Sequence, residues 1–311
     1  MTSYLPHHYD PEGYFIQSRE DAQLALLVLT KSEIPKYLIQ PSADSIYFPY
    51  LVQYIENVAN RGNLPDGKLI FSLHDAIWSK DDTFPILTFG RPVGDKSCFL
   101  LPDPFYIQAS GYMEGHAFLK GLDVAWAKRK PLAYFRGSST GGQLMLNSWR
   151  TNRRVKLVEL SLKYPNLIDA RITAIVQEEE AGVSDEIAKA GLISAFEPPE
   201  TSLNYKYLVD IDGNANSWGY FLKLAMGSLV FKVDSMWEQW FYEWIEPWVH
   251  YVPVKADLSD LVEKIEWALS NDSQAEQIAK NGKEFALKLN YDLSVDYGID
   301  LLTEAINAMA G

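Results

Sequence analysis

The sequence predicts an α/β protein with mostly parallel sheets. Short β-rich runs bounded by turn residues recur along the chain, and amphipathic helical patterns separate them. Strands that alternate with helices favour crossover units, which bury a parallel sheet between helices. The chain has 311 residues, which suits two domains of about 150 residues each better than one. We therefore expect two α/β domains.

Seven β-rich runs define the expected strands. Each one combines branched or aromatic residues with flanking turn residues. They cover residues 69–73, 85–89, 132–135, 167–173, 205–211, 229–233 and 251–254. The clearest helix begins at Asp257, with apolar residues on one face, and a second has Ser273 and Glu276 in capping-box spacing. The aromatic run from Trp237 to Trp248 has spacings of three and four residues, which predict an amphipathic helix packed on the sheet.

Composition and charge limit the partners. A net charge of -13 repels polyanions over most of the surface, which argues against nucleic acid or a broadly bound anionic membrane. An anionic small ligand would need a local cationic pocket, for which Arg136 and Lys223 are the candidates. The basic run at residues 128–130 is expected to be a solvated face or an interdomain link.

The expected location is cytoplasmic. The single cysteine, Cys98, fits a reducing compartment. The sequence contains no apolar run of membrane-spanning length, and its first residues lack the pattern of a signal peptide. We expect at most peripheral contact with a membrane.

Three segments hold most of the chemistry, and each follows an expected strand and leads into an expected helix. They are Asp75, residues 136–142 and residues 210–218. The carboxyl ends of parallel strands share one edge of a sheet, where ligands bind. We therefore expect these segments to converge on an active site.

The first glycine-rich segment, YFRGSSTGG, is open to three interpretations. Backbone N–H groups after a strand suit a phosphate, which Arg136 would clamp. Alternatively, Gly137, Ser139 and Gly141 form the G-x-S-x-G of a nucleophile elbow, with Asp210 or Asp212 as the acid and His250 as the base. The third interpretation is a plain helix-capping loop.

The second segment, KYLVDIDGNANSW, ends a strand with Asp210 and Asp212 on one face. The pair matches the D-x-D pattern of metal-dependent nucleotide-sugar enzymes. We favour a different role, in which these acids cap the loop and hold ligand hydroxyls.

Four motifs in order, YFRGSSTGG, KYLVDIDGNANSW, GSLVFKV and PWVHYVPVKADLSDL, resemble glycosyltransferase family 90. This family includes animal protein O-glucosyltransferases, fungal capsule-associated proteins and bacterial lipopolysaccharide glycosyltransferases. The match covers roughly residues 131–285, and four motifs that agree are more specific than one. The first half of the chain matches only weakly.

The resemblance implies a GT-B architecture, in which two Rossmann-like domains with mostly parallel sheets face an interdomain cleft. It also implies a UDP-sugar donor, no metal or other cofactor, and inversion at the anomeric carbon. Residues 1–128 would form the acceptor-side domain, residues 129–290 the donor domain, and residues 291–311 a C-terminal helix that packs back on the first domain. The catalytic aspartate of the family follows a strand of the N-terminal domain, and Asp75 holds that place, although Ala76 and Ile77 depart from the Asp-aromatic-Pro context.

The same resemblance assigns the donor site. The expected donor-binding residues are Arg136, Gly137, Ser138, Ser139, Asp212, Gly213, Asn214, Asn216, Ser217, Trp218 and Lys223. Many members carry an arginine shortly after the serine of the second segment, where this chain has Gly219. Lys223 lies one helical turn further on and is the candidate to supply that charge. Trp78 and Trp218 stand beside polar loops and are placed to contact sugar.

These expectations define a function and its rivals. The leading hypothesis is transfer of glucose or xylose from a UDP-sugar to a hydroxyl acceptor, in bacterial surface glycan or lipopolysaccharide synthesis. The rivals are an α/β serine hydrolase that uses Ser139 and a non-catalytic nucleotide-sugar-binding protein.

Overall fold

The computed structural model describes residues 24–30, 33–37, 48–72, 75, 85–96, 98–112 and 124–310. Internal contacts divide the chain into two compact units. Unit 1 takes residues 1–113, 236–242 and 289–311, and unit 2 takes residues 114–235 and 243–288. The domain limits expected from the sequence, at residues 128 and 290, stay a prediction.

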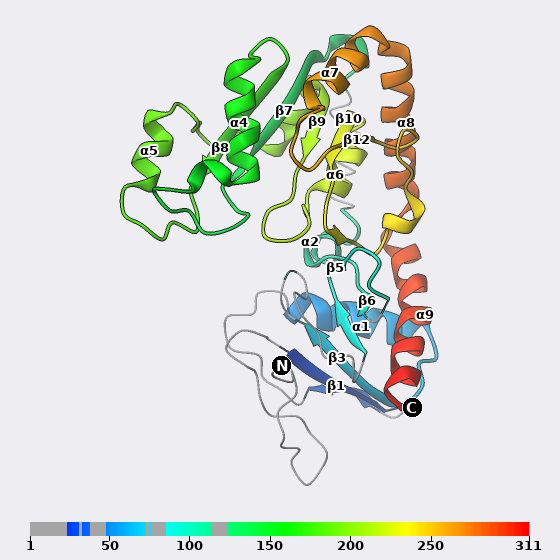
Figure 1. Ribbon diagram of the computed structural model, residues 1–311. Coiled ribbons are helices and arrows are strands. Elements are labelled where there is room, and N and C mark those ends of the chain that lie inside the picture. The colour runs from blue at the N-terminus through cyan, green and yellow to red at the C-terminus, as the bar shows by residue number, and fades with distance from the viewer. Residues whose placement is uncertain are drawn as a thin grey trace. The chain divides into compact units, whose positions relative to one another are not determined.

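Unit 1 is built on a five-stranded mixed sheet with the order β2-β1-β3-β4-β6. β1 pairs antiparallel with β2 and β3, whereas β3, β4 and β6 are parallel. Its elements are β1 (Leu24–Thr30), β2 (Glu33–Tyr37), α1 (Phe48–Arg61), β3 (Gly67–Ser72), β4 (Ile86–Thr88), β5 (Arg91–Pro92), β6 (Cys98–Leu100), α2 (Pro104–Gln108), β11 (Trp237–Glu238) and α9 (Tyr291–Ala310). The C-terminal helix α9 packs on α1 and β3 (Figure 1).

Close packing explains the contact between α1 and α9. The Tyr54 hydroxyl donates to the Ser294 carbonyl at 2.5 Å. A Cβ at Gly298 would stand 2.6 Å from the same hydroxyl oxygen, so the two helices approach where α9 has no side chain.

Unit 2 is built on a five-stranded sheet in which every neighbouring pair is parallel, with the order β12-β10-β9-β7-β8. Its α-helices and strands are β7 (Lys130–Ser138), α4 (Arg153–Lys163), β8 (Ile168–Ala174), α5 (Val183–Lys189), β9 (Tyr205–Asp210), α6 (Tyr220–Ala225), β10 (Leu229–Val233), β12 (Val252–Val254), α7 (Leu261–Ser270) and α8 (Asp272–Lys288). Short 3-10 turns lie at Trp126–Lys128, Trp149–Thr151 and Pro199–Asn204, and a fourth, Tyr242–Trp244, spans the junction of the units. Figure 1 shows α4 and α6 beside the strands that they connect.

The core of unit 2 follows the two-residue period of its strands. Ala133 and Phe135 of β7 join a buried cluster with Val209, Phe231 and residues of α4, α7 and α8. Tyr134 and Arg136 alternate with them and lie on the other face of β7. The α/β class with parallel strands, predicted from the sequence, is confirmed, while the GT-B cleft between two domains stays a prediction.

The predicted strands are all present within a few residues of their expected limits. They correspond to β3, β4, β7, β8, β9, β10 and β12. The two expected C-terminal helices are α7 and α8, and α7 begins at Leu261 instead of Asp257.

The expected aromatic helix is wrong. Residues 237–248 form the short strand β11, a 3-10 turn and irregular backbone. Trp237 pairs with Pro92, and the Arg91 guanidinium contacts the Glu238 carboxylate at 2.6 Å. Trp240 and Phe241 are buried as core packing requires, but a pairing with β5 replaces the helix.

Lys128 and Lys130 of the basic run are exposed, as expected, and Arg129 is the exception. Its side chain is buried and donates to Ser228 Oγ at 2.8 Å and to the Met226 carbonyl at 3.0 Å. The guanidinium therefore ties the start of β7 to the end of α6 and does not form a solvated face. Within the described ranges, no helix combines the length and apolarity needed to cross a bilayer.

Candidate active site at the carboxyl edge of unit 2

The topology of unit 2 brings two of the three predicted segments together. From β7 the chain goes outward to β8 and then returns to the other side of β7 at β9. Loops that follow β7 and β9 therefore leave the sheet in opposite directions, the arrangement at which open parallel sheets bind ligands. The backbone N–H of Gly141 donates to Asn214 Oδ1 at 3.0 Å and joins the two loops directly.

The glycine turn starts later than the sequence suggested. β7 continues to Ser138, and the Ser139 N–H donates to the Ala174 carbonyl, so Gly137 and Ser138 lie in the ladder with β8. Gly141 and Gly142 both have φ of 120°, a conformation that favours glycine. The N–H of Ser139 is therefore used within the sheet and the positive-φ glycine turn lies at Gly141 and Gly142, while the donor cradle expected at residues 137–139 stays a prediction.

Gly213 fits a close approach between the same two loops. A Cβ at this position would stand 2.5 Å from Thr140 Oγ1. Any other residue would push the loop after β9 away from the glycine turn.

Ser139 is a structural residue. It is fully buried, and its hydroxyl donates to the Val176 carbonyl at 3.0 Å while accepting from the Val176 N–H at 2.9 Å. A nucleophile needs an exposed oxygen next to a base, and this oxygen is enclosed between the ends of β7 and β8. The nucleophile-elbow hypothesis is therefore wrong. For the same reason the Ser139 hydroxyl is not accessible to a sugar-nucleotide ligand.

Asp210 is a buried carboxylate held between two lysines. Lys223 Nζ lies 2.7 Å from one oxygen and Lys232 Nζ 3.1 Å from the other. Burial opposes ionisation, but the two ammonium groups outweigh it and lower the pKa of Asp210 to about 2. Asp210 is therefore ionised at neutral pH and organises the lysines of the edge.

Asp212 and Asn216 carry buried polar atoms without hydrogen-bond partners among the described residues. Asp212 Oδ1 accepts from the Ser217 N–H at 3.3 Å and faces Lys232 at 3.4 Å, while its Oδ2 lacks a hydrogen bond. Both amide atoms of Asn216 lack one as well, although the side chain is buried. Buried polar atoms are normally hydrogen-bonded, so these atoms mark a place for a polar ligand.

Lys223 lies beside Gly219. Its Nζ stands 3.7 Å from where a Cβ at Gly219 would be and 3.3 Å from Ser217 Oγ. A Cβ at position 219 would therefore be in ordinary van der Waals contact with the ammonium. Trp218 of the same loop is partly exposed.

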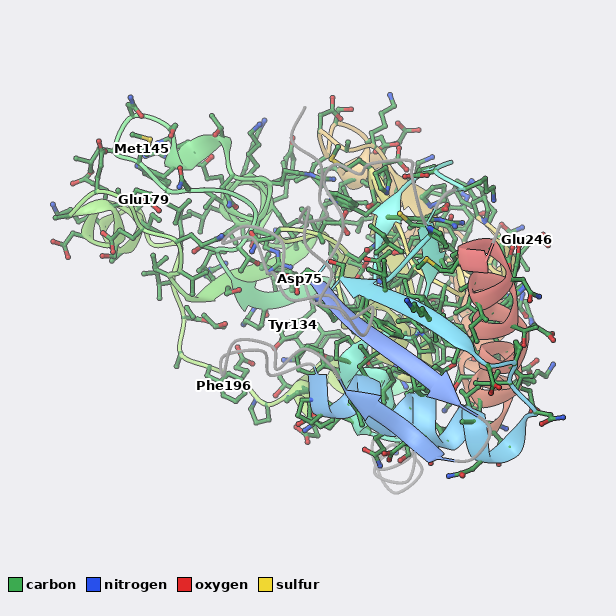
Figure 2. The ribbon with its side chains drawn as sticks, turned by 90° about the horizontal axis from the view of Figure 1, so that it is seen from below. Asp75, Tyr134, Met145, Glu179, Phe196 and Glu246 are labelled. Atoms are coloured by element: carbon green, nitrogen blue, oxygen red, sulfur yellow. The ribbon has the colours of Figure 1, made fainter. Side chains whose placement is uncertain are left out.

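Arg136 lies within β7, away from the glycine turn. Its Nη2 lies 2.9 Å from an Asp169 oxygen, its Nε 2.5 Å from a Glu197 oxygen, and its guanidinium covers the ring of Tyr134, labelled in Figure 2. Nη1 donates to the carbonyls of Phe135 and Asp169. The expected phosphate clamp stays a prediction, and this geometry speaks against it because the guanidinium already joins two carboxylates.

Two arginines that the sequence reasoning missed reach the edge instead. Arg153 and Arg154 begin α4, whose N-cap Asn152 accepts from the N–H groups of Arg154 and Val155. Arg154 donates to the Ser138 and Ile211 carbonyls at 3.1 Å and to Thr140 Oγ1 at 2.6 Å. It also donates to the carbonyl of Asp212 at 3.1 Å, and its hydrogen bonds thus connect the loops after β7 and β9. In the sequence, a pair of arginines directly after a helix-capping asparagine was the pattern that could have indicated these two residues.

Asp75, the expected base, belongs to unit 1. It is partly exposed and follows the end of β3 (Figure 2). Residues 73–74 and 76–84, which include Trp78, lie outside the described residues.

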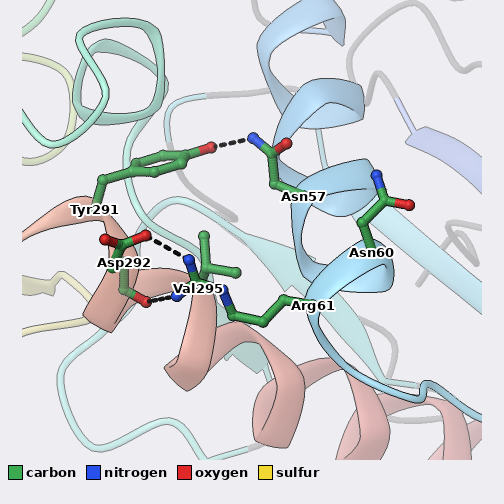
Figure 3. Close-up of a pocket in the computed structure, with 6 residues that line it drawn as sticks. All are labelled: Asn57, Asn60, Arg61, Tyr291, Asp292 and Val295. Carbon is green, nitrogen blue, oxygen red and sulfur yellow. Dashed lines mark hydrogen bonds and ion pairs between the residues drawn. The ribbon is translucent and has the colours of Figure 1, made fainter.

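Unit 1 contains a pocket of about 420 Å³ between α1 and the start of α9. It is lined by Asn57, Asn60, Arg61, Tyr291, Asp292 and Val295 (Figure 3). Asn57 donates to the Tyr291 hydroxyl at 2.9 Å, and Arg61 pairs with Asp292 and donates to its carbonyl at 3.0 Å. These groups hold the two helices together, so we interpret the pocket as part of the packing between α1 and α9 and not as a ligand site.

Comparison with known proteins decides the family. The model of Glycosyl transferase family 90 matches residues 118–309, more than half of the chain. The chain belongs to glycosyl transferase family 90. The match contains every edge residue described above in unit 2, from Ser138 to Lys232.

Two curated relatives of this family-90 chain are protein O-glucosyltransferases. Protein O-glucosyltransferase 3 of Homo sapiens is 38% identical over 167 residues, which are 53% of this chain and 29% of the relative. Protein O-glucosyltransferase 1 of Rattus norvegicus is 36% identical over 180 residues, 58% of this chain and 42% of the relative. The chain thus spans less than half the length of either relative.

Among solved structures, one that the chain matches is that of HepE from Anabaena in complex with UDP-glucose. It is 13% identical, has a TM-score of 0.40 and covers 60% of this chain and 52% of its own.

Proposed function

We propose that this family-90 chain transfers a sugar, glucose or xylose, from a UDP-sugar to a hydroxyl acceptor with inversion of the anomeric carbon. The relatives named protein O-glucosyltransferase support glycosyl transfer. The observation that carries the proposal is the carboxyl edge of unit 2. Cationic side chains, glycine N–H groups and the unpartnered amide of Asn216 gather there at a topological switch point.

The edge suits a sugar diphosphate in a protein of net charge -13. Phosphate oxygens need donors and positive charge. Lys223 brings the positive charge, and the turn at residues 140–142 offers backbone N–H groups besides that of Gly141, which already donates to Asn214. Hydroxyl groups both donate and accept, and the side-chain atoms of Asn216 and Asp212 match that requirement.

In the proposed mechanism, Asp75 removes the proton of the acceptor hydroxyl. The oxygen then attacks the anomeric carbon, and the bond from that carbon to the diphosphate oxygen breaks on the opposite face. Negative charge grows on the departing UDP, where the glycine turn and Lys223 stabilise it.

The proposed reaction uses no metal ion. A D-x-D site would need the Asp210 and Asp212 carboxylates for the cation, but here they hold Lys223 and Lys232. The lysines supply the positive charge that the metal would bring. Full activity in the presence of EDTA is the expected result, and loss of activity that Mg²⁺ or Mn²⁺ restores would contradict it.

The proposed setting is cytoplasmic synthesis of a bacterial surface glycan or lipopolysaccharide, with peripheral membrane contact at most. This part rests on the resemblance of the motifs to bacterial members of the family.

The test is a turnover screen with UDP-glucose, UDP-xylose and UDP-galactose, followed by Asp75→Asn. We expect UDP release with one of these donors and a loss of ~10²- to 10⁴-fold in kcat for the variant, because a general base typically contributes that much. UDP binding should persist in the variant. An Asp75→Asn protein that turns over normally would refute the base assignment, and UDP binding without turnover of any donor would favour a silent binding protein.

A further inference from the structure

In the part of the chain that the structure describes, four cationic side chains reach the carboxyl edge of unit 2: Arg153, Arg154, Lys223 and Lys232. They differ in the number and closeness of the ion pairs and hydrogen bonds that they form with other groups of the protein. Lys232 is buried and faces both Asp210 and Asp212, and Lys223 pairs with Asp210 at 2.7 Å. Arg154 makes four hydrogen bonds to the loops after β7 and β9. These three side chains are held in place by protein groups.

Arg153 is the least engaged of the four. Its Nη2 donates to the Asp234 carbonyl at 2.6 Å, its Nη1 lies 4.0 Å from Asp212 Oδ2, and its Nε has no hydrogen-bond partner among the described residues. The side chain is 35% exposed, more than Lys223 or Lys232. Because the guanidinium of Arg153 makes few hydrogen bonds to protein groups and is partly exposed at the carboxyl edge, it keeps N–H donors available for an anion.

The position of Arg153 reinforces this assignment. It is the first residue of α4, an eleven-residue helix whose positive end points to the carboxyl edge. Arg153 itself donates to the carbonyl of Asp234, directly after β10, while its neighbour Arg154 binds the carbonyl of Ile211, directly after β9, and fixes the glycine turn through Thr140. The unpartnered atoms of Asp212 and Asn216 lie on the loop that Arg153 faces.

We propose that Arg153, and not Arg136, is the side chain that contacts the diphosphate of the donor. The inference rests on the proposed function, since it assumes that an anionic nucleotide binds at this edge. The phosphate would displace the long contact between Arg153 and Asp212 Oδ2, which leaves Oδ2 to a donor hydroxyl while Lys232 stays on Oδ1.

Affinity measurements with UDP and uridine test this assignment. The variants are Arg153→Gln, Arg153→Lys and a matched control, Arg150→Gln. Arg150 lies three residues earlier, is 60% exposed, and stacks on Trp149 with its guanidinium carbon 4.0 Å from the ring centroid. Calorimetry measures UDP, saturation-transfer NMR measures uridine, and circular dichroism confirms that each variant is folded.

We expect Arg153→Gln to weaken UDP binding roughly ten- to a hundredfold, the effect of losing a hydrogen bond to a charged group, and to leave uridine binding unchanged. Arg153→Lys should retain part of the affinity, and Arg150→Gln all of it. Equal affinity of wild type and Arg153→Gln for UDP would overturn this assignment alone. A fall that is the same for uridine would overturn it too, because the loss would then be structural. A wild-type protein that does not bind UDP would overturn the proposed donor and this inference together.

Discussion

Two aspartates, one in each unit, are buried to the same degree and behave in opposite ways. Asp103 in unit 1 is 1% exposed and Asp210 in unit 2 is 0% exposed. Burial raises the pKa of Asp103 to about 7, because the hydrogen bonds from the Tyr106 N–H and the Tyr112 hydroxyl offset it only in part. Two lysines overcome the same burial at Asp210 and lower its pKa to about 2.

The difference separates a structural carboxyl from one in an organised charged site. Asp103 caps the five-residue helix α2, and the groups that set its pKa are its buried surroundings, backbone N–H groups and the Tyr112 hydroxyl, without a cation among them. A cap needs only an acceptor, which a neutral carboxyl still provides. Asp210 fixes the positions of two ammonium groups at the carboxyl edge of the sheet, which only the charged form achieves.

The largest expected effect comes from breaking the charged cluster of unit 2. Lys232→Met leaves Asp210 and Asp212 with one fewer buried cation, and removing one partner of a buried pair typically costs about 3–5 kcal/mol. Urea unfolding, followed in the transition of unit 2, measures the loss. Lys189→Met is the control, because Lys189 is 73% exposed and its ion pair with Glu186 lies on the surface. A Lys232→Met protein as stable as wild type would show that Asp210 does not depend on this lysine.

The second prediction concerns the pH dependence of Asp103. Its folded pKa is raised above the unfolded value, so its contribution to stability is complete below about pH 4 and is lost as the pH rises through about 7. Three pKa units correspond to about 4 kcal/mol. We expect Asp103→Asn to gain stability relative to wild type by an amount of this order between pH 4 and pH 8.

The measurement is urea unfolding of wild type and Asp103→Asn across that pH range. Asp300→Asn, an exposed position on α9 of the same unit, is the control and should follow the wild-type curve. Parallel curves for wild type and Asp103→Asn would show that the carboxyl ionises freely in the folded protein.

Asp210 should give the opposite slope in acid. Its folded pKa is depressed, so its contribution is present above about pH 4 and is lost as the pH falls toward 2. About two pKa units correspond to roughly 2.5 kcal/mol. Asp210→Asn lacks this titration, and the difference in unfolding free energy between wild type and variant should therefore shrink from pH 5 to pH 2. A difference that stays constant over this range would contradict the depressed pKa.

The sequence anticipated the strands but not the partners of the charges. Strand runs such as residues 205–211 and 229–233 are local patterns, and they correspond closely to β9 and β10. The two loops of the edge could be located as well, because parallel strands must end together.

What a charged side chain does depends on residues distant in sequence. Asp169 and Glu197, which hold Arg136, lie 33 and 61 residues away from it along the chain. No spacing rule predicts such pairs, so the sequence alone did not show the partners of Arg136 or the place of Arg153. The aromatic run failed in the same way, because β11 owes its form to a pairing with Pro92.

The smallest expected effect distinguishes the two lysines of the cluster. Lys223 is 23% exposed and pairs with Asp210 alone, whereas Lys232 is 7% exposed and faces both carboxylates. Water therefore screens part of the Lys223 pair, and we expect Lys223→Met to cost about 1 kcal/mol in urea unfolding, well below the cost of Lys232→Met. The same variant should weaken UDP binding under the proposed function, because the Lys223 ammonium is the more accessible of the two. Equal losses of unfolding free energy in Lys223→Met and Lys232→Met would contradict this prediction, because they would show that solvent exposure does not weaken the pair between Lys223 and Asp210.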